Sequence, residues 1–148
     1  EEFVRTLCHR YLIVRSAWVY GIGRDFVSTV LNAAADPTCP WLAVPTDRFA
    51  SPTSADDLTA AVEQLIDHDT LGIYHIVCQG RCSRYDFAQA ILKAAHMEDK
   101  LELHPIRAAD AGSTPSYTVL DNLMLRLDNL PQPRPWKEAL NEYINSLQ

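Results

Sequence analysis

The chain has 148 residues, of which 47% are hydrophobic and 22% charged, and this balance is typical of one globular domain with a sizeable core. Its net charge of -6 argues against a general nucleic-acid surface, because phosphate binding depends on clustered Lys and Arg. No apolar run approaches the roughly 20 residues of a membrane helix, and no signal peptide is visible. We therefore expect a cytoplasmic protein that binds neither nucleic acid nor membrane.

The four cysteines are dispersed and form no C-x-x-C pair, so we expect reduced thiols. A zinc site at Cys78 and Cys82 is not favoured, because no second pair of ligands follows them. The five histidines have no ligand spacing either. The sequence therefore predicts no metal site.

A helix is predicted at the start, where Phe3 and Leu7 share one face with no cap before them, which suggests a fragment. The apolar run 12–21 then predicts a buried parallel strand, and Gly21-Ile22-Gly23 reads as a turn. Ligands of open α/β sheets collect beyond the carboxyl ends of strands, so Ser16, Trp18 and Tyr20 would lie beside a small molecule. The alternative is that these side chains only pack the core.

Asp25 predicts the cap of a short amphipathic helix that ends before Pro37, and residues 42–44 follow as a strand. Residues 45–53 contain two prolines and one arginine among small residues, which indicates an irregular loop. The guanidinium of Arg48 in this loop could grip a phosphate, or it could be a solvated surface group.

Two capping boxes predict helices in the middle of the chain. Ser54 with Asp57 precedes a helical stripe at 58–66, and Ser83 with Asp86 precedes another that starts at Phe87. A strand is predicted between them at 73–77, so helices and strands alternate as in βαβ units.

The last third of the chain predicts a short strand, a mobile loop and two helices. Their expected ranges are 101–103, 107–116, 121–127 and 136–147 respectively.

Common catalytic templates are absent: the chain has no G-x-S-x-G, no Walker loop and no H-E-x-x-H. Asp56 and Asp57 lie in a capping position, where free helix amides explain both carboxylates. The pairs Tyr11–Arg15 and Tyr20–Arg24 have the spacing of a Tyr-x-x-x-Lys pair, but an arginine pKa is too high for a proton relay.

The chain resembles the C-terminal half of the dTDP-4-dehydrorhamnose reductases, a family of the extended short-chain dehydrogenase/reductase superfamily. Residues 15–21 match R-T-S-W-x-Y-G, and residues 51–58 match S-P-T-x-A-D-D-L. Further matches follow in family order at Phe26-Val27, 72–75, 83–88 and 117–122. The resemblance covers essentially the whole chain.

This resemblance implies an α/β fold: the last strands of a Rossmann-like parallel sheet plus a small mixed α/β substrate-binding lobe. Residues 1–148 would form one domain, with the N-terminal cofactor-binding domain absent. In the family, NADPH, or NADH as an alternative, reduces dTDP-4-dehydro-L-rhamnose to dTDP-L-rhamnose for cell-surface polysaccharides. The catalytic Tyr-x-x-x-Lys pair would lie upstream, so this fragment would contain no catalytic residue.

The resemblance also implies site residues. Ser16 and Ala17 would lie near the nicotinamide. The dTDP-sugar would contact Trp18, Tyr20, Arg48, Ser51, Pro52 and Thr53.

Two positions depart from the family pattern. The family motif D-Q-x-G-S-P-T aligns with residues 47–53, and Arg48 takes the place of its Gln. Thr114 takes the place of an Arg that the family often has before proline. If that arginine holds the diphosphate, Arg48 or Arg107 would have to substitute, or the ligand differs.

Two other functions are compatible with the same residues. One is a non-catalytic regulatory subunit similar to the methionine adenosyltransferase β subunit, and the other is a different nucleotide-sugar epimerase or reductase. For the reductase, the sequence leaves open a homodimer or a fusion to a dTDP-sugar epimerase domain.

Overall fold

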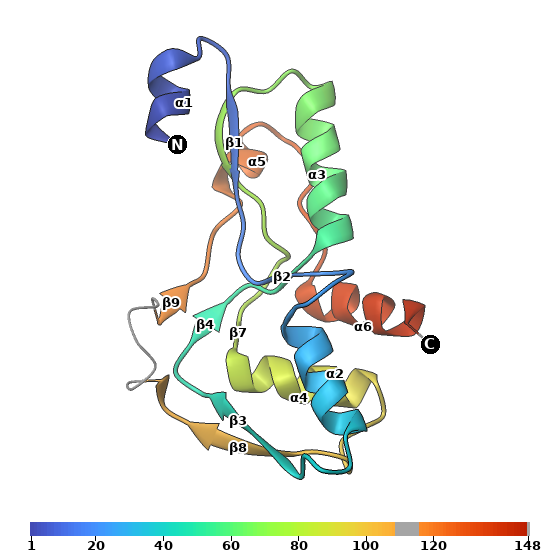
Figure 1. Ribbon diagram of the computed structural model, residues 1–148. Helices are drawn as coiled ribbons and strands as arrows, with labels where there is room; N and C mark the ends of the chain where they lie inside the picture. The colour runs from blue at the N-terminus through green and yellow to red at the C-terminus, as the bar shows by residue number, and fades with distance from the viewer. Residues whose placement is uncertain (109–115, 148) are drawn as a thin grey trace.

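Two parallel strands, β1 (Leu12–Arg15) and β6 (Gly72–His75), form the upper part of the computed structural model, which describes residues 1–108 and 116–147 (Figure 1). Val14 lies opposite Tyr74 in the pairing register, so the predicted parallel arrangement is confirmed. β1 is half-buried rather than buried, because β6 is its one partner among the described residues.

The predicted strand 12–21 is broken into two. β2 (Val19–Tyr20) leaves the first sheet and pairs in parallel with β5 (Thr53–Ser54). Trp18 lies between β1 and β2 with a φ of 42°, in the left-handed region, where a strand cannot continue. The single long strand was therefore a wrong prediction.

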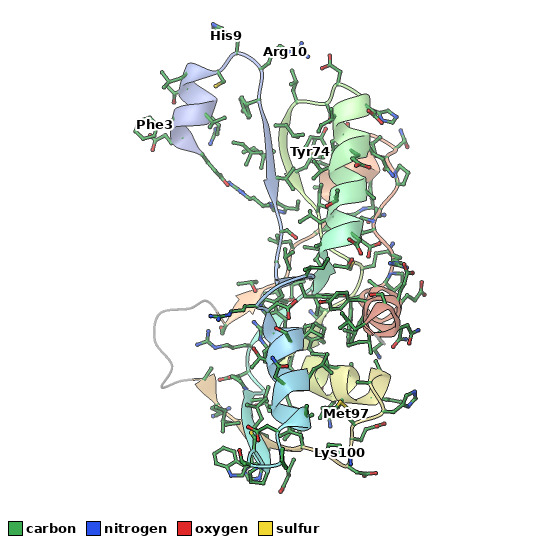
Figure 2. All side chains as sticks on the ribbon, turned by 45° about the vertical axis from the view of Figure 1, so that its right-hand side comes forward. Phe3, His9, Arg10, Tyr74, Met97 and Lys100 are labelled. Atoms are coloured by element: carbon green, nitrogen blue, oxygen red, sulfur yellow. The ribbon has the colours of Figure 1, made fainter. Side chains whose placement is uncertain are left out.

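Two helices cover the β1–β6 pair, α3 (Ala55–Asp67) and α5 (Leu123–Leu127). Tyr74 lies in this upper core (Figure 2). The buried side chains of the cluster are Ala61, Leu65, Tyr74, Ile76, Leu125 and Leu130.

The predicted first helix is confirmed as α1 (Glu2–Leu7). Its apolar side chains are uncovered, with Phe3 81% and Leu7 74% exposed. Figure 2 shows Phe3 on the side of α1 that points away from the rest of the molecule.

The lower part of the molecule packs around α4 (Arg84–Ala94) (Figure 1). Helices α2 (Phe26–Ala35) and α6 (Trp136–Ser146) contact it, as does the parallel pair β3 (Trp41–Pro45) and β8 (Glu102–Ile106). Phe87 of α4 is completely buried in this core, with Trp136 of α6 edge-on to its ring. The amphipathic patterns of these three helices thus mark their buried faces correctly.

Two of the three predicted caps hold as capping boxes. Asp25 pairs with Ser28 at the start of α2, and Ser83 pairs with Asp86 at the start of α4. Ser54 accepts from the backbone N–H of Asp57, but the Asp57 carboxylate does not reach back to the cap. It accepts from Nε of Arg134 at 3.0 Å instead, so that half of the predicted box was wrong.

A three-stranded sheet was missed by sequence reasoning. β4 (Phe49–Ala50) lies between β7 (Cys82–Ser83), which is antiparallel to it, and β9 (Tyr117–Thr118), which is parallel. The stretch 45–53 is therefore not irregular throughout.

Other element boundaries also differ from prediction. β6 ends at His75 rather than at Val77, and β8 begins and ends later than 101–103. The helix predicted at 121–127 begins at Leu123 as α5, and Asp121 forms a salt bridge with Arg126. Most of the predicted loop 107–116 lies outside the described residues.

No helix within residues 1–108 and 116–147 combines the length and apolarity needed to cross a membrane.

Candidate functional site

A cavity of about 580 Å³ lies beyond the carboxyl end of β1. It is where the general rule for α/β sheets places a ligand. Its lining comes from the β1–β2 connection, the segment before β4, the start of α4 and the segment around β9. The residues are Arg15, Ser16, Ala17, Trp18, Arg48, Arg84, Thr118 and Leu120.

A second cavity of about 590 Å³ lies between α4 and β8. Its lining alternates leucines with solvated side chains such as Lys93 and Glu98. We place the candidate site in the first cavity, because that one joins a strand end, an aromatic ring and two neighbouring cations.

Trp18 is held in the first cavity by tertiary contacts. The guanidinium of Arg84 lies 3.6 Å from the centre of its indole ring, and the Phe87 ring stacks at a centroid distance of 6.3 Å. A left-handed backbone at a bulky residue is strained by about 1–2 kcal/mol, and such strain concentrates at functional sites. Arg84 thus lies over one face of the indole.

Ser16 places an unpaired polar atom beside Trp18. Its Oγ is buried and makes no hydrogen bond with any described residue. Leaving a buried hydroxyl unpaired costs about 1–3 kcal/mol, so a ligand that bonded to it would recover that free energy. Ala17 is buried next to it, packed with Ala50 and Val77.

Arg48 and Arg84 lie side by side because of the sheet register. The backbone N–H of Arg84 donates to the carbonyl of Arg48 at 2.9 Å, continuing the β4–β7 ladder. Burial lowers the pKa of Arg84 to about 10, and the charge of Arg48 contributes to the lowering. With this pKa, Arg84 is still a cation at neutral pH.

Tyr20 lies in the core, outside the cavity lining. It is 2% exposed, and its ring packs against Phe87 and Tyr143 at centroid distances of 5.7 and 5.4 Å. Burial raises the pKa of its phenol, whose oxygen has no partner among the described residues. Of the two roles expected from the sequence, ligand contact and core packing, the position of Tyr20 agrees with core packing.

Ser51, Pro52 and Thr53 are also buried and outside the cavity lining. Ser51 donates to the carbonyl of Gly80 at 2.7 Å, and the Thr53 hydroxyl donates to the carbonyl of Ser51 at 3.1 Å. Ser51 lines a neighbouring cavity of about 380 Å³ that shares Leu120 with the first. This segment therefore lies next to the first cavity and does not line it.

Four cavity residues were not predicted as site residues: Arg15, Thr118, Leu120 and Arg84. Arg84 was noted only within the capping box at Ser83 and the family match at 83–88. A usable signal was present. A cation in the first turn of a helix opposes the helix dipole, so an arginine there directly after the serine cap calls for another explanation.

The described residues contain no group of three or more His, Cys, Asp or Glu side chains that could hold a metal ion. All four cysteines are free, and Cys78 and Cys82 are buried. Burial raises the pKa of Cys78 to about 11 and that of Cys82 to about 12.

These thiols should differ in reactivity in the native protein. Iodoacetamide at pH 8 should alkylate the exposed Cys8, while Cys78 and Cys82 stay unlabelled until the protein is denatured. The reason is that the thiolate is the nucleophile, and a pKa near 11 leaves only on the order of one thiolate in 10³ at pH 8. Peptide mass mapping checks this, and native labelling of Cys82 as fast as Cys8 would contradict it.

Fold and site together define a class of protein: an α/β chain with Rossmann-like parallel strands and a smaller lobe that places a ligand cavity at a strand end. The family model described as the RmlD substrate binding domain matches residues 1–148, and the chain belongs to this family. The resemblance and the fold class expected from the sequence are both confirmed.

Individual relatives agree with this assignment. A solved dTDP-4-dehydrorhamnose reductase from Clostridium acetobutylicum is 39% identical with a TM-score of 0.92, over 99% of this chain and 52% of its own. The Bacillus anthracis reductase, solved in complex with NADP, is 30% identical with the same TM-score and coverage. The spore coat polysaccharide biosynthesis protein SpsK of Bacillus subtilis is 37% identical, over 97% of this chain and 50% of SpsK. The chain therefore spans about half the length of the curated relatives it matches.

Proposed function

We propose that this chain is the dTDP-sugar-binding part of an NADPH-dependent dTDP-4-dehydrorhamnose reductase. The observation that carries the proposal is the cavity beyond β1, which brings Trp18, Ser16 and Arg48 together. The membership of the whole chain in the RmlD substrate-binding family, and two relatives named as this reductase, support it.

The cavity residues suit a nucleotide sugar. The Trp18 ring offers an apolar surface to one face of the sugar and holds its C4 carbonyl in place. Arg48 is a planar cation that can bind a phosphate through two parallel hydrogen bonds. The cavity volume, about 580 Å³, is in the range usual for small-molecule sites.

Ser16 and Ala17 fit the cofactor side of the site. The buried Ser16 Oγ, which lacks a partner among the described residues, can bond a polar group of the cofactor, and buried Ala17 leaves room beside it. When bound, NADPH supplies the hydride that reduces the C4 carbonyl. The proton donor is the expected upstream tyrosine, so these two residues bind and orient only.

The regulatory-subunit hypothesis has less support, because none of the three relatives reported above carries a regulatory name. A different nucleotide-sugar enzyme would share the fold, and Ser16-Ala17-Trp18-Val19-Tyr20-Gly21 is the segment that favours the reductase over it. The single-domain organisation, the missing cofactor domain, a homodimer, a fused epimerase and a cytoplasmic location stay predictions.

The full-length protein that contains this chain should oxidise NADPH in the presence of dTDP-4-dehydrorhamnose, while the isolated chain should not. The reason is that the 148 residues contain neither a Tyr-x-x-x-Lys pair nor a glycine-rich cofactor loop. The loss of NADPH absorbance measures both, with heat-killed protein as the control. Turnover by the isolated chain above that control, or an inert full-length protein with an intact Tyr-Lys pair, would refute the proposal.

A further inference from the structure

We propose that Arg84 is a substrate-binding and positioning residue: with Arg48 it grips the diphosphate of a nucleotide sugar, and its guanidinium holds the Trp18 ring in place. This rests on the proposed function, since it names the group that the same cavity recognises.

Backbone geometry places both arginines at one spot. Phe49 lies opposite Ser83 in the antiparallel β4–β7 register, so the residues next in line, Arg48 and Arg84, are also neighbours. The hydrogen bond of 2.9 Å between their backbones confirms the proximity. Both side chains are half-buried and line the same cavity.

The pair concentrates positive charge in a chain whose net charge is -6. Within residues 1–108 and 116–147, neither guanidinium forms a salt bridge or donates a side-chain hydrogen bond. Among the described residues that line the cavity, none is Asp or Glu. Two neighbouring half-buried cations repel each other, and a bound anion with two or more charges removes that repulsion.

The stacking of Arg84 leaves its hydrogen-bond donors free. Its guanidinium carbon lies 3.6 Å from the Trp18 ring centre and 4.5 Å from that of Phe26. A guanidinium lying on an aromatic face keeps its N–H groups in its own plane, where they match two phosphate oxygens. The same stacking restrains Trp18, whose backbone is already in the left-handed region. Diphosphate binding and ring placement are thus coupled through one side chain.

The test measures binding of dTDP, inorganic pyrophosphate and thymidine to the full-length protein by titration calorimetry. Arg84→Met keeps an apolar stem of similar length over Trp18 and removes the charge. It should raise the Kd of dTDP and of pyrophosphate about 10- to 100-fold, because a hydrogen bond to a charged group is the interaction lost. The Kd of thymidine should change less than about twofold, and the dependence of dTDP binding on salt should weaken.

Arg81→Met is the matched control. Arg81 is exposed, donates to the Tyr117 hydroxyl at 2.7 Å and lines the neighbouring cavity, so its loss should leave all three affinities unchanged. Arg84→Lys keeps the charge without the planar fork and should recover part of the dTDP affinity. If Arg84→Met melts at a much lower temperature than the unsubstituted protein, Arg84→Lys and Arg48→Gln test the proposal instead. Each should raise the Kd of dTDP more than the Kd of thymidine.

Unchanged dTDP affinity in folded Arg84→Met, an equal loss in Arg81→Met, or an equal loss for thymidine would overturn the proposal. Failure of the proposed function gives a different result. A full-length protein that does not reduce dTDP-4-dehydrorhamnose, but loses pyrophosphate binding in Arg84→Met, overturns the reductase and keeps the anion site. Normal reduction of dTDP-4-dehydrorhamnose with an unchanged KM in Arg84→Met keeps the reductase and overturns the anion site.

Discussion

Phe87→Ala should lower the free energy of unfolding by about 3–5 kcal/mol, the usual cost of emptying a buried phenylalanine site. Phe87 is 0% exposed, and its ring contacts Trp18, Tyr20, Phe26 and Trp136 at centroid distances of 5.7 to 6.3 Å. These rings come from the β1–β2 segment, α2 and α6, so no single neighbour can move to fill the void. Urea unfolding followed by circular dichroism measures the loss.

Phe3→Ala provides the comparison for Phe87→Ala. Phe3 is 81% exposed, so its truncation should change the free energy of unfolding by less than about 0.5 kcal/mol. An unfolding midpoint for Phe87→Ala equal to that of Phe3→Ala would show that the lower core is not organised around Phe87.

Trp18→Ala in the full-length protein should lower kcat/KM for dTDP-4-dehydrorhamnose by on the order of 10- to 100-fold, since misplacing reacting atoms by ~1 Å can cost 10²-fold. The variant loses the ring that we propose contacts the sugar, and it also removes the surface on which Arg84 stacks. Trp18→Phe should recover much of the activity because it restores an aromatic face. Steady-state kinetics together with a melting curve for each variant measures the effect.

Trp41→Ala is the control for Trp18→Ala. Trp41 is 51% exposed and stacks on His104 of β8, outside the cavity lining, so its loss should leave kcat/KM unchanged. If Trp18→Ala melts much earlier while its folded fraction keeps full kcat/KM, Trp18 is a core residue and its substrate role is refuted.

Local sequence signals predicted the helices well. The boxes at Asp25 and Ser83 each satisfy backbone amides within four residues, and such short-range hydrogen bonds can be recognised from spacing. Apolar stripes likewise identified the buried faces of α3 and α6, because helical periodicity repeats every three to four residues. The parallel pairing of β1 with β6 was also within reach, since helices alternate with strands between them as in βαβ units.

Short strands were not predictable in the same way. β2, β4 and β9 are two residues long, and two residues carry no period. Their pairing depends on partners that lie from about 30 to about 70 positions away, as in Phe49 with Tyr117. Sequence reasoning therefore described 45–53 as a loop.

By itself the sequence determined the α/β class, the capped helices and the strand end at which the cavity lies, since these depend on short-range pattern and on a general rule for parallel sheets. The tertiary structure alone decided what faces that cavity. It moved Tyr20 into the core, turned Trp18 with a left-handed backbone and set Arg84 beside Arg48. The physical reason is that side-chain direction depends on pairing register and packing between distant segments, where one residue of shift points a side chain to the opposite face.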